Sequence, residues 1–164
     1  MKLPAHTEYT HTTSPLGRIS LAATGANLVG VWFEGQAHLP DLTRFKQTPN
    51  HPVLQLAAVQ LAQYFAGQRS HFDLPLDLST GTAFQQTVWQ ELLTITRGQT
   101  CSYKALSALI GKPAAVRAVG GAVGRNPLSI IVPCHRVVGA NGALTGYAGG
   151  LERKTALLHL EGAF

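Results

Sequence analysis

The first third of the chain carries short apolar runs separated by turn residues, a pattern typical of neighbouring antiparallel strands. Ser, Pro and Gly at 14–17 separate a threonine-rich segment from residues 18–23, and Gly25 precedes residues 28–33. Such residues favour tight turns because they pre-set or relax the backbone angles that a chain reversal needs. We therefore expect a three-stranded meander over residues 6–33.

Apolar positions switch to a helical spacing after a polar stretch, residues 34–50, which we expect to be irregular. From His51 to Phe65 they recur every three or four residues, and Gly67 follows. This spacing predicts an amphipathic helix that Gly67 ends. Its apolar positions are Val53, Leu54, Leu56, Ala57, Leu61 and Phe65.

A connector rich in turn residues divides the chain near its middle. Residues 68–82 contain Pro75 and a Ser-Thr-Gly-Thr cluster, a composition typical of loops. We place a domain boundary near residue 80, which predicts an N-terminal structural domain over residues 1–80 and a C-terminal domain over residues 81–164.

Two short helices joined by a tight turn are predicted in the second half. Ser102 can cap a helix over residues 103–110, a break follows at 111–113, and residues 114–123 form the second helix. Two helices joined by a short, glycine-bearing turn are typical of a helix-turn-helix. Thr82 can cap a longer helix before them, with an inner face of Phe84, Val88, Trp89, Leu92 and Leu93.

Gly120 and Gly121 lie inside the second helix of this pair, where each glycine costs about 1 kcal/mol relative to alanine. Close helix packing is the explanation we favour, and close approach of a ligand is the alternative. Pro127 then interrupts the helix, a glycine-rich stretch covers residues 139–150, and leucines predict a last helix over residues 151–160.

The composition is that of a globular protein with a basic surface. Apolar residues make up 45% of the 164 residues and charged residues 13%, which excludes a disordered chain. No apolar run approaches the roughly 20 residues of a membrane span, and residues 1–13 have no signal-peptide core. We therefore expect a cytoplasmic protein with no membrane partner, and a monomer. A net charge of +5 favours a polyanionic partner such as nucleic acid.

The two cysteines, Cys101 and Cys134, argue against both a disulfide and a metal site. A reducing compartment disfavours a disulfide between them. No cysteine precedes residue 101 and no Cys-x-x-Cys pair exists, so we expect no structural zinc. Cys101 is interpreted as a structural thiol.

Cys134 stands in a sequence setting that favours a nucleophile. Pro133 precedes it, and His135 and Arg136 place a base and a cation next to the sulfur in sequence. A neighbouring cation lowers the pKa of a thiol, and the thiolate is the reactive form. Adjacent side chains on a strand point to opposite faces, so a direct contact between Cys134 and His135 needs a turn, or a bridging water. Spacing leaves open which carboxylate orients the histidine, Glu152 or Glu161.

The segment Ile131–Val138 resembles the active-site signature of the O6-alkylguanine-DNA alkyltransferases, also called methylated-DNA–protein-cysteine methyltransferases. The resemblance is dense from Phe84 to the end of the chain. The pattern of matching residues looks like that of the single-domain bacterial type. Further matching segments are Ser102-Tyr103, Arg117 to Gly121, Asn126-Pro127, Thr145 to Leu151, Leu157-Leu158 and Glu161-Gly162.

This resemblance implies an α/β (α+β) fold in two parts. The N-terminal part would be a small antiparallel sheet with a helix, in a ribonuclease H-like layout. The C-terminal part would be mostly helical and winged-helix-like, and would hold the helix-turn-helix, the DNA-binding surface and the alkyl acceptor.

The resemblance also implies a DNA-repair reaction without a cofactor. Cys134 would accept an alkyl group from O6-alkylguanine in double-stranded DNA and be used once. His135 would act as a base through a water, Glu161 would orient it, and Asn126 would shape the turn that positions the segment. The family comparison therefore favours Glu161 over Glu152.

The remaining implied roles concern DNA and the base. Arg117 would enter the minor groove and take the place of the flipped nucleotide, while Tyr103 would press on the target phosphate near the flipped guanine. Lys104 and Lys112 can hold phosphates. The substrate pocket would be lined by Val137, Tyr147 and Ala148.

Two other classes of function stay open from the sequence. A binding module would recognise the lesion without repairing it, as relatives that lack the acceptor cysteine do. A Cys–His hydrolase would release its product repeatedly and would not need a helix-turn-helix.

Overall fold

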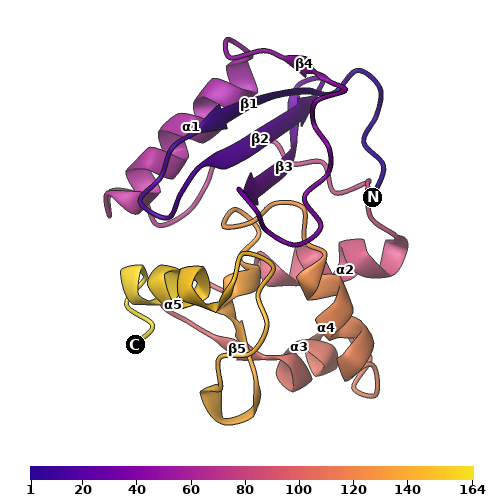
Figure 1. Cartoon of the computed structure of the whole chain (residues 1–164). Helices are drawn as coiled ribbons and strands as arrows, with labels where there is room; N and C mark the ends of the chain where they lie inside the picture. Colours follow the sequence, from indigo (N-terminus) through magenta and orange to yellow (C-terminus); the bar gives the residue numbers. More distant parts are fainter. The chain divides into compact units, whose positions relative to one another are not determined.

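The computed structural model describes residues 1–164 and forms two compact units, residues 1–80 and 81–164 (Figure 1). No helix in it is long and apolar enough to cross a membrane.

The N-terminal unit is built on a small sheet. Strands β1 (Glu8–Thr12), β2 (Ile19–Thr24) and β3 (Asn27–Phe33) form the expected antiparallel meander. The two-residue strand β4 (Lys46–Gln47) adds to β1 in parallel, giving the order β3-β2-β1-β4. The prediction of an irregular segment was wrong at β4, because two exposed polar residues paired through the backbone leave no apolar pattern.

One helix, α1 (Pro52–Phe65), packs against this sheet (Figure 1). It begins as expected at His51, whose Nδ1 accepts a hydrogen bond from the backbone N–H of Val53 at 3.2 Å. Leu56 was predicted on the apolar side and is 43% exposed, because the apolar positions span a wider arc of the helix than the sheet covers.

The central strands are buried on both faces. Ala22 of β2 and Trp32 of β3 pack with Leu3, Val29 and Leu42 into one apolar cluster. Trp32 and Gly30 lie two residues apart and therefore on the same face of β3. The indole covers the glycine so closely that a Cβ built on Gly30 would lie 1.8 Å from Trp32 Cη2.

Replacing Gly30 with alanine is expected to destabilise the protein by about 1–3 kcal/mol, because the new methyl group overpacks a core that cannot yield without moving the indole. Chemical denaturation measures this free energy of unfolding. In a Trp32→Phe background the same replacement should cost less, since the ring that the methyl group meets is removed. An equal cost in both backgrounds would show that the indole is not the obstacle.

The C-terminal unit is mostly helical. Helix α2 (Ala83–Leu92) begins with a capping box between Thr82 and Gln85, and α3 (Tyr103–Leu109) is capped by Ser102. Helix α4 (Val116–Gly124) follows α3 after a short turn, which gives the predicted helix-turn-helix. The remaining elements are β5 (Cys101–Ser102), η1 (Cys134–Arg136), β6 (Val137–Val138), η2 (Ala140–Gly142) and α5 (Leu151–Leu160).

Helix α2 packs against α4, and the indole N–H of Trp89 donates to the carbonyl of Ala122 at 2.8 Å. Val88, Trp89 and Leu92 are buried as predicted, but Leu93 is 45% exposed. Leu93 is the C-cap of α2, so it lies past the helical residues that face the core.

Candidate active site

Cys134 begins a single 3-10 turn, η1, rather than continuing a strand. Cys134 is buried, with 4% of its surface exposed. The chain then enters β6, which pairs in parallel with β5, Val137 opposite Cys101 and Ser102 opposite Val138. This pairing fixes the turn beside Ser102, where α3 begins.

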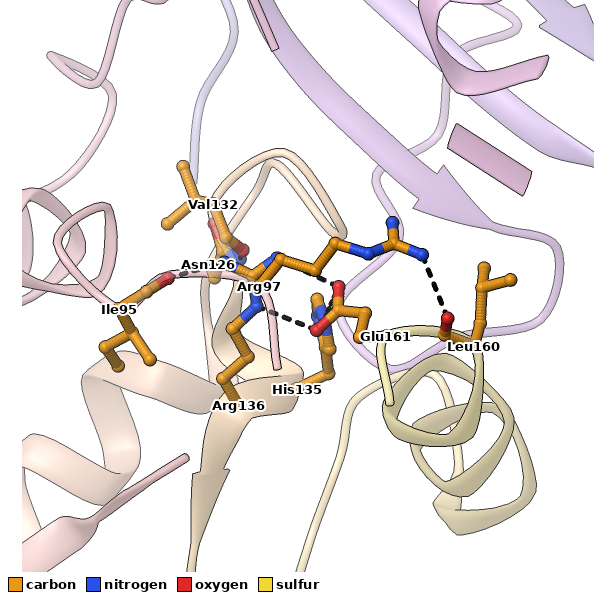
Figure 2. Close-up of polar contacts among 8 residues, drawn as sticks. All are labelled: Ile95, Arg97, Asn126, Val132, His135, Arg136, Leu160 and Glu161. Atoms are coloured by element: carbon orange, nitrogen blue, oxygen red, sulfur yellow. Dashed lines mark hydrogen bonds and ion pairs between the residues drawn. The ribbon is translucent and has the colours of Figure 1, made fainter. Parts of the chain in front are cut away.

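Asn126 holds the segment that leads into this turn. Its side chain donates to the carbonyl of Val132 at 2.8 Å (Figure 2). It also accepts from the N–H of Leu128 at 3.0 Å, and the residue is buried. Between these contacts Ile130 has φ +74°, a left-handed conformation that is strained for a β-branched residue. The surrounding contacts, including those of Asn126, keep this backbone in place, so Asn126 has the position that a turn-shaping residue requires.

Glu161 is the centre of a buried polar network beside Cys134. Its Oε2 lies 2.8 Å from His135 Nε2, and Arg136 donates from Nε to Oε1 at 2.8 Å and from Nη2 to Oε2 at 2.9 Å (Figure 2). The side chains of His135 and Glu161 are 0% exposed. Of the two carboxylates left open by spacing, Glu161 contacts the histidine, whereas Glu152 is exposed in the first turn of α5.

Further contacts hold the end of α5 next to η1. Arg97 donates to the carbonyl of Leu160 at 2.9 Å, and Arg136 donates to the carbonyl of Ile95 (Figure 2). Glu161 itself is the C-cap of α5. Glu161, three positions before the last residue, is therefore buried and fixed instead of frayed.

The protonation states follow from burial. Burial raises the pKa of Cys134 to about 11, against smaller lowering effects from a hydrogen bond with Asn126 and the charge of Lys154. Burial also lowers the pKa of His135, although Glu161 opposes this shift. At neutral pH the resting site therefore holds a thiol and a neutral imidazole. Because the Nε2 side faces Glu161, the Nδ1 atom of His135 is left as a buried ring nitrogen without a hydrogen-bond partner.

Lys154 is a site residue that the sequence interpretation missed. Its Nζ donates to the carbonyls of Val137, Thr145 (2.9 Å) and Gly146 (3.2 Å), and the residue is fully buried. It thereby joins β6 to the loop that precedes α5. A signal was present, since Lys154 lies three and four residues before Leu157 and Leu158 and so shares their buried face.

The predicted pocket residues lie in this same region. Val137 is buried in β6, and Tyr147 and Ala148 are half-buried in the loop before α5. Tyr103 is half-buried at the start of α3, and burial raises its pKa, with a hydrogen bond from Thr145 lowering it and the Cys134 charge raising it. The interactions bring Tyr103, Thr145 and Cys134 into one neighbourhood.

Three of the predicted DNA-contacting side chains lie on the surface rather than in the buried network. Lys104, Lys112 and Arg117 are exposed on the helix-turn-helix. The helix α4 that carries Arg117 also exposes Gly121, where an added Cβ would meet no atom within 4 Å. A Cβ on Gly120 would make only an ordinary contact with the Tyr103 ring at 3.8 Å. Packing within the chain, the explanation favoured from the sequence, is therefore wrong for Gly121.

Family models match both parts of the chain. The 6-O-methylguanine DNA methyltransferase DNA-binding domain matches residues 83–163, and the ribonuclease-like domain of the same proteins matches residues 8–78. A methylated-DNA–protein-cysteine methyltransferase of Mycobacterium tuberculosis is 50% identical over 153 residues, covering 93% of this chain and 91% of its own length. The chain belongs to the 6-O-methylguanine DNA methyltransferase family.

Other members of the methyltransferase family are similar in sequence and in structure. The methylated-DNA–protein-cysteine methyltransferase of Haemophilus influenzae is 44% identical, over 93% of this chain and 85% of its own. The crystal structure of Mycobacterium tuberculosis OGT in complex with DNA superposes with a TM-score of 0.89 at 49% identity, covering 94% of this chain and 92% of that one. The ribonuclease-like N-terminal part and the DNA-binding C-terminal part expected from the sequence are confirmed.

Proposed function

We propose that this protein repairs DNA by taking the alkyl group of an O6-alkylguanine onto Cys134. It acts as a methylated-DNA–protein-cysteine methyltransferase, the activity after which its relatives are named. The observation that carries the proposal is the buried thiol of Cys134 in a turn that also brings His135 into hydrogen-bond contact with Glu161. We also propose that the protein is a monomer, that each molecule reacts once and without a cofactor, and that it works on duplex DNA in the cytoplasm.

The reaction is a displacement at the alkyl carbon. The Cys134 sulfur forms a bond to that carbon, the bond between the carbon and guanine O6 breaks, and the electron pair stays on the guanine, which takes up a proton. The product is a thioether, so the protein keeps the alkyl group. A thiolate is the reactive form of cysteine, which makes the removal of the thiol proton the task of the surrounding residues.

His135 supports that task through its unpartnered nitrogen. Glu161 occupies the Nε2 side of the ring, so Nδ1 is the atom free to take the Cys134 proton, through a bridging water. The Glu161 carboxylate favours the resulting imidazolium and raises the pKa of His135 against the effect of burial. Asn126 positions the turn, and Val137, Tyr147 and Ala148 line the pocket for the base.

The helix-turn-helix is the surface that we assign to DNA. The Mycobacterium tuberculosis relative was crystallised with DNA and shares this fold. Exposed Gly121 supports close approach of α4 to a partner outside the chain. In this proposal α4 enters the minor groove, Arg117 fills the space of the flipped nucleotide, Tyr103 presses on the target phosphate, and Lys104 and Lys112 contact other phosphates.

A mass spectrum of the intact protein, recorded after incubation with duplex DNA that contains O6-methylguanine, tests the proposal. Alkyl transfer adds one methyl group per chain, and peptide mapping should place it on Cys134. A protein that binds the DNA but gains no mass would be a lesion-binding module. Repaired DNA with an unmodified protein and repeated turnover would indicate a Cys–His hydrolase.

Arg117→Ala is expected to slow the repair of duplex DNA far more than the reaction with free O6-benzylguanine. A free base needs no extrusion from a stack, whereas flipping a nucleotide costs a few kcal/mol that an inserted side chain offsets. Single-turnover rates on both substrates measure the difference. Arg44→Ala removes an exposed arginine from the N-terminal unit and controls for net charge. Equal losses on the two substrates would mean that Arg117 supports the fold or the pocket.

A further inference from the structure

Lys154 is a fully buried ammonium group with no carboxylate partner. Its three N–H donors bind the carbonyls of Val137, Thr145 and Gly146, which satisfies its hydrogen bonds but leaves its charge uncompensated. Burying an ion without a counter-ion costs several kcal/mol. A neutral amide could donate to the same region of backbone at a lower cost, so the charge itself calls for an explanation.

The titratable groups around Lys154 leave one candidate for the missing negative charge. Glu161 is already paired with Arg136, burial keeps His135 neutral, and the raised pKa of Tyr103 keeps its phenol protonated. The remaining group that can ionise is Cys134, which is buried and lies three residues before Val137, whose carbonyl accepts a hydrogen bond from the Lys154 ammonium. A Cys134 thiolate and the Lys154 ammonium stabilise each other, since each shifts the pKa of the other toward the charged form.

We infer that Lys154 is a positioning residue whose ammonium serves as the counter-ion of the Cys134 thiolate during alkyl transfer. The inference rests on the proposed function. In the resting protein the thiol is protonated, and the ammonium is held by the backbone of β6 and of the loop at 145–146. When the proton leaves the sulfur, the negative charge forms where a positive charge is already fixed, so no reorganisation is needed at that moment.

Three proteins test this inference, all in a Cys101→Ser background so that Cys134 is the one thiol. Lys154→Gln removes the charge and keeps N–H donors, and Lys154→Arg keeps the charge. Single-turnover transfer from free O6-benzylguanine avoids any effect on DNA contacts. At neutral pH we expect Lys154→Gln to be slower than the parent by on the order of 100-fold, with Lys154→Arg between the two.

The dependence of the transfer rate on pH separates an effect of the Lys154 charge from a purely structural role of Lys154 in holding the loop. The parent rate should rise with pH and then flatten where Lys154 loses its proton, at a pKa that burial lowers. The Lys154→Gln rate should keep rising, so the ratio of the two rates shrinks toward one in alkali. Arginine stays charged throughout, so the bend should be absent from Lys154→Arg even if Lys154→Gln does not fold.

Two results would overturn the inference. A ratio of parent to Lys154→Gln rates that stays constant at every pH would mean that the lysine only braces the loop. A bend that persists in Lys154→Arg would assign it to another group. A parent protein that transfers nothing to Cys134 at any pH would contradict the proposed alkyl transfer instead, so the two failures are distinguishable.

Discussion

Serine in place of Cys134 is expected to leave a protein that binds duplex DNA within a few fold of the parent and transfers no alkyl group. A hydroxyl is a weak nucleophile at neutral pH, and its proton is far harder to remove than that of a thiol. The exposed cations of the helix-turn-helix are unchanged, so the phosphate contacts and the affinity that they supply should persist. Mass spectrometry after incubation with O6-methylguanine DNA measures transfer, and fluorescence anisotropy of a labelled duplex measures binding.

Cys101→Ser is the matched control for this loss. Cys101 is half-exposed, lies in β5, and its pKa is raised by burial and then by the charge of Glu91, so neither influence activates it. The control variant should transfer the alkyl group at the parent rate. A methyl group found on Cys101 of the Cys134→Ser protein would overturn the assignment of the acceptor.

The sequence predicted the elements that local patterns determine. The turn residues and short apolar runs of the meander, and the caps Thr82 and Ser102, act over a few residues, and the structure confirms them. The motif around Cys134 indicated a nucleophile because a neighbouring base and a neighbouring cation favour the reactive thiolate.

What the sequence left open depends on contacts between distant segments. Spacing could not separate Glu161 from Glu152, since the choice follows from Arg97 and Arg136 holding the end of α5 beside η1. Lys154 was overlooked because a lysine in a helix is ordinarily solvated, and only the folded chain brings one carbonyl of β6 and two of the loop before α5 to its ammonium.

The explanation for Gly121 also needed the structure. Helical position alone does not tell whether a glycine faces a neighbouring helix or solvent, and the open space around Gly121 shows that no part of this chain requires it. The residue agrees with a helix that an external partner approaches closely, which is the role proposed for α4.

Glu161→Gln is expected to lower the transfer rate at neutral pH by on the order of 100-fold or more, the range of general base catalysis. Glu161 is the group that raises the pKa of His135 against burial. Without its charge the imidazole accepts the Cys134 proton less readily, and the reaction depends more on thiolate formed by the solvent. Because burial raises the Cys134 pKa to about 11, that route gains with rising pH, so the variant should recover part of its deficit in alkali.

The same replacement should also destabilise the fold. A near-isosteric change of this kind at an exposed site would leave the stability almost unchanged. Arg136 is buried and relies on the carboxylate for two hydrogen bonds, and a buried pair that loses one partner typically costs about 3–5 kcal/mol. Rates must therefore be measured well below the melting temperature of each variant, followed by circular dichroism.

Two further variants separate the effect on His135 from the loss of the ion pair. Arg136→Gln breaks the same pair but leaves the carboxylate on the histidine, so it should be destabilised and yet lose less of the transfer rate than Glu161→Gln. Glu152→Gln changes an exposed carboxylate on α5 and should behave like the parent in both respects. A slow Glu152→Gln beside a normal Glu161→Gln would show that the wrong carboxylate had been assigned. Equal rate losses in Glu161→Gln and Arg136→Gln would mean that the Glu161 carboxylate has no specific effect on His135. Glu161 would then only hold the turn in place.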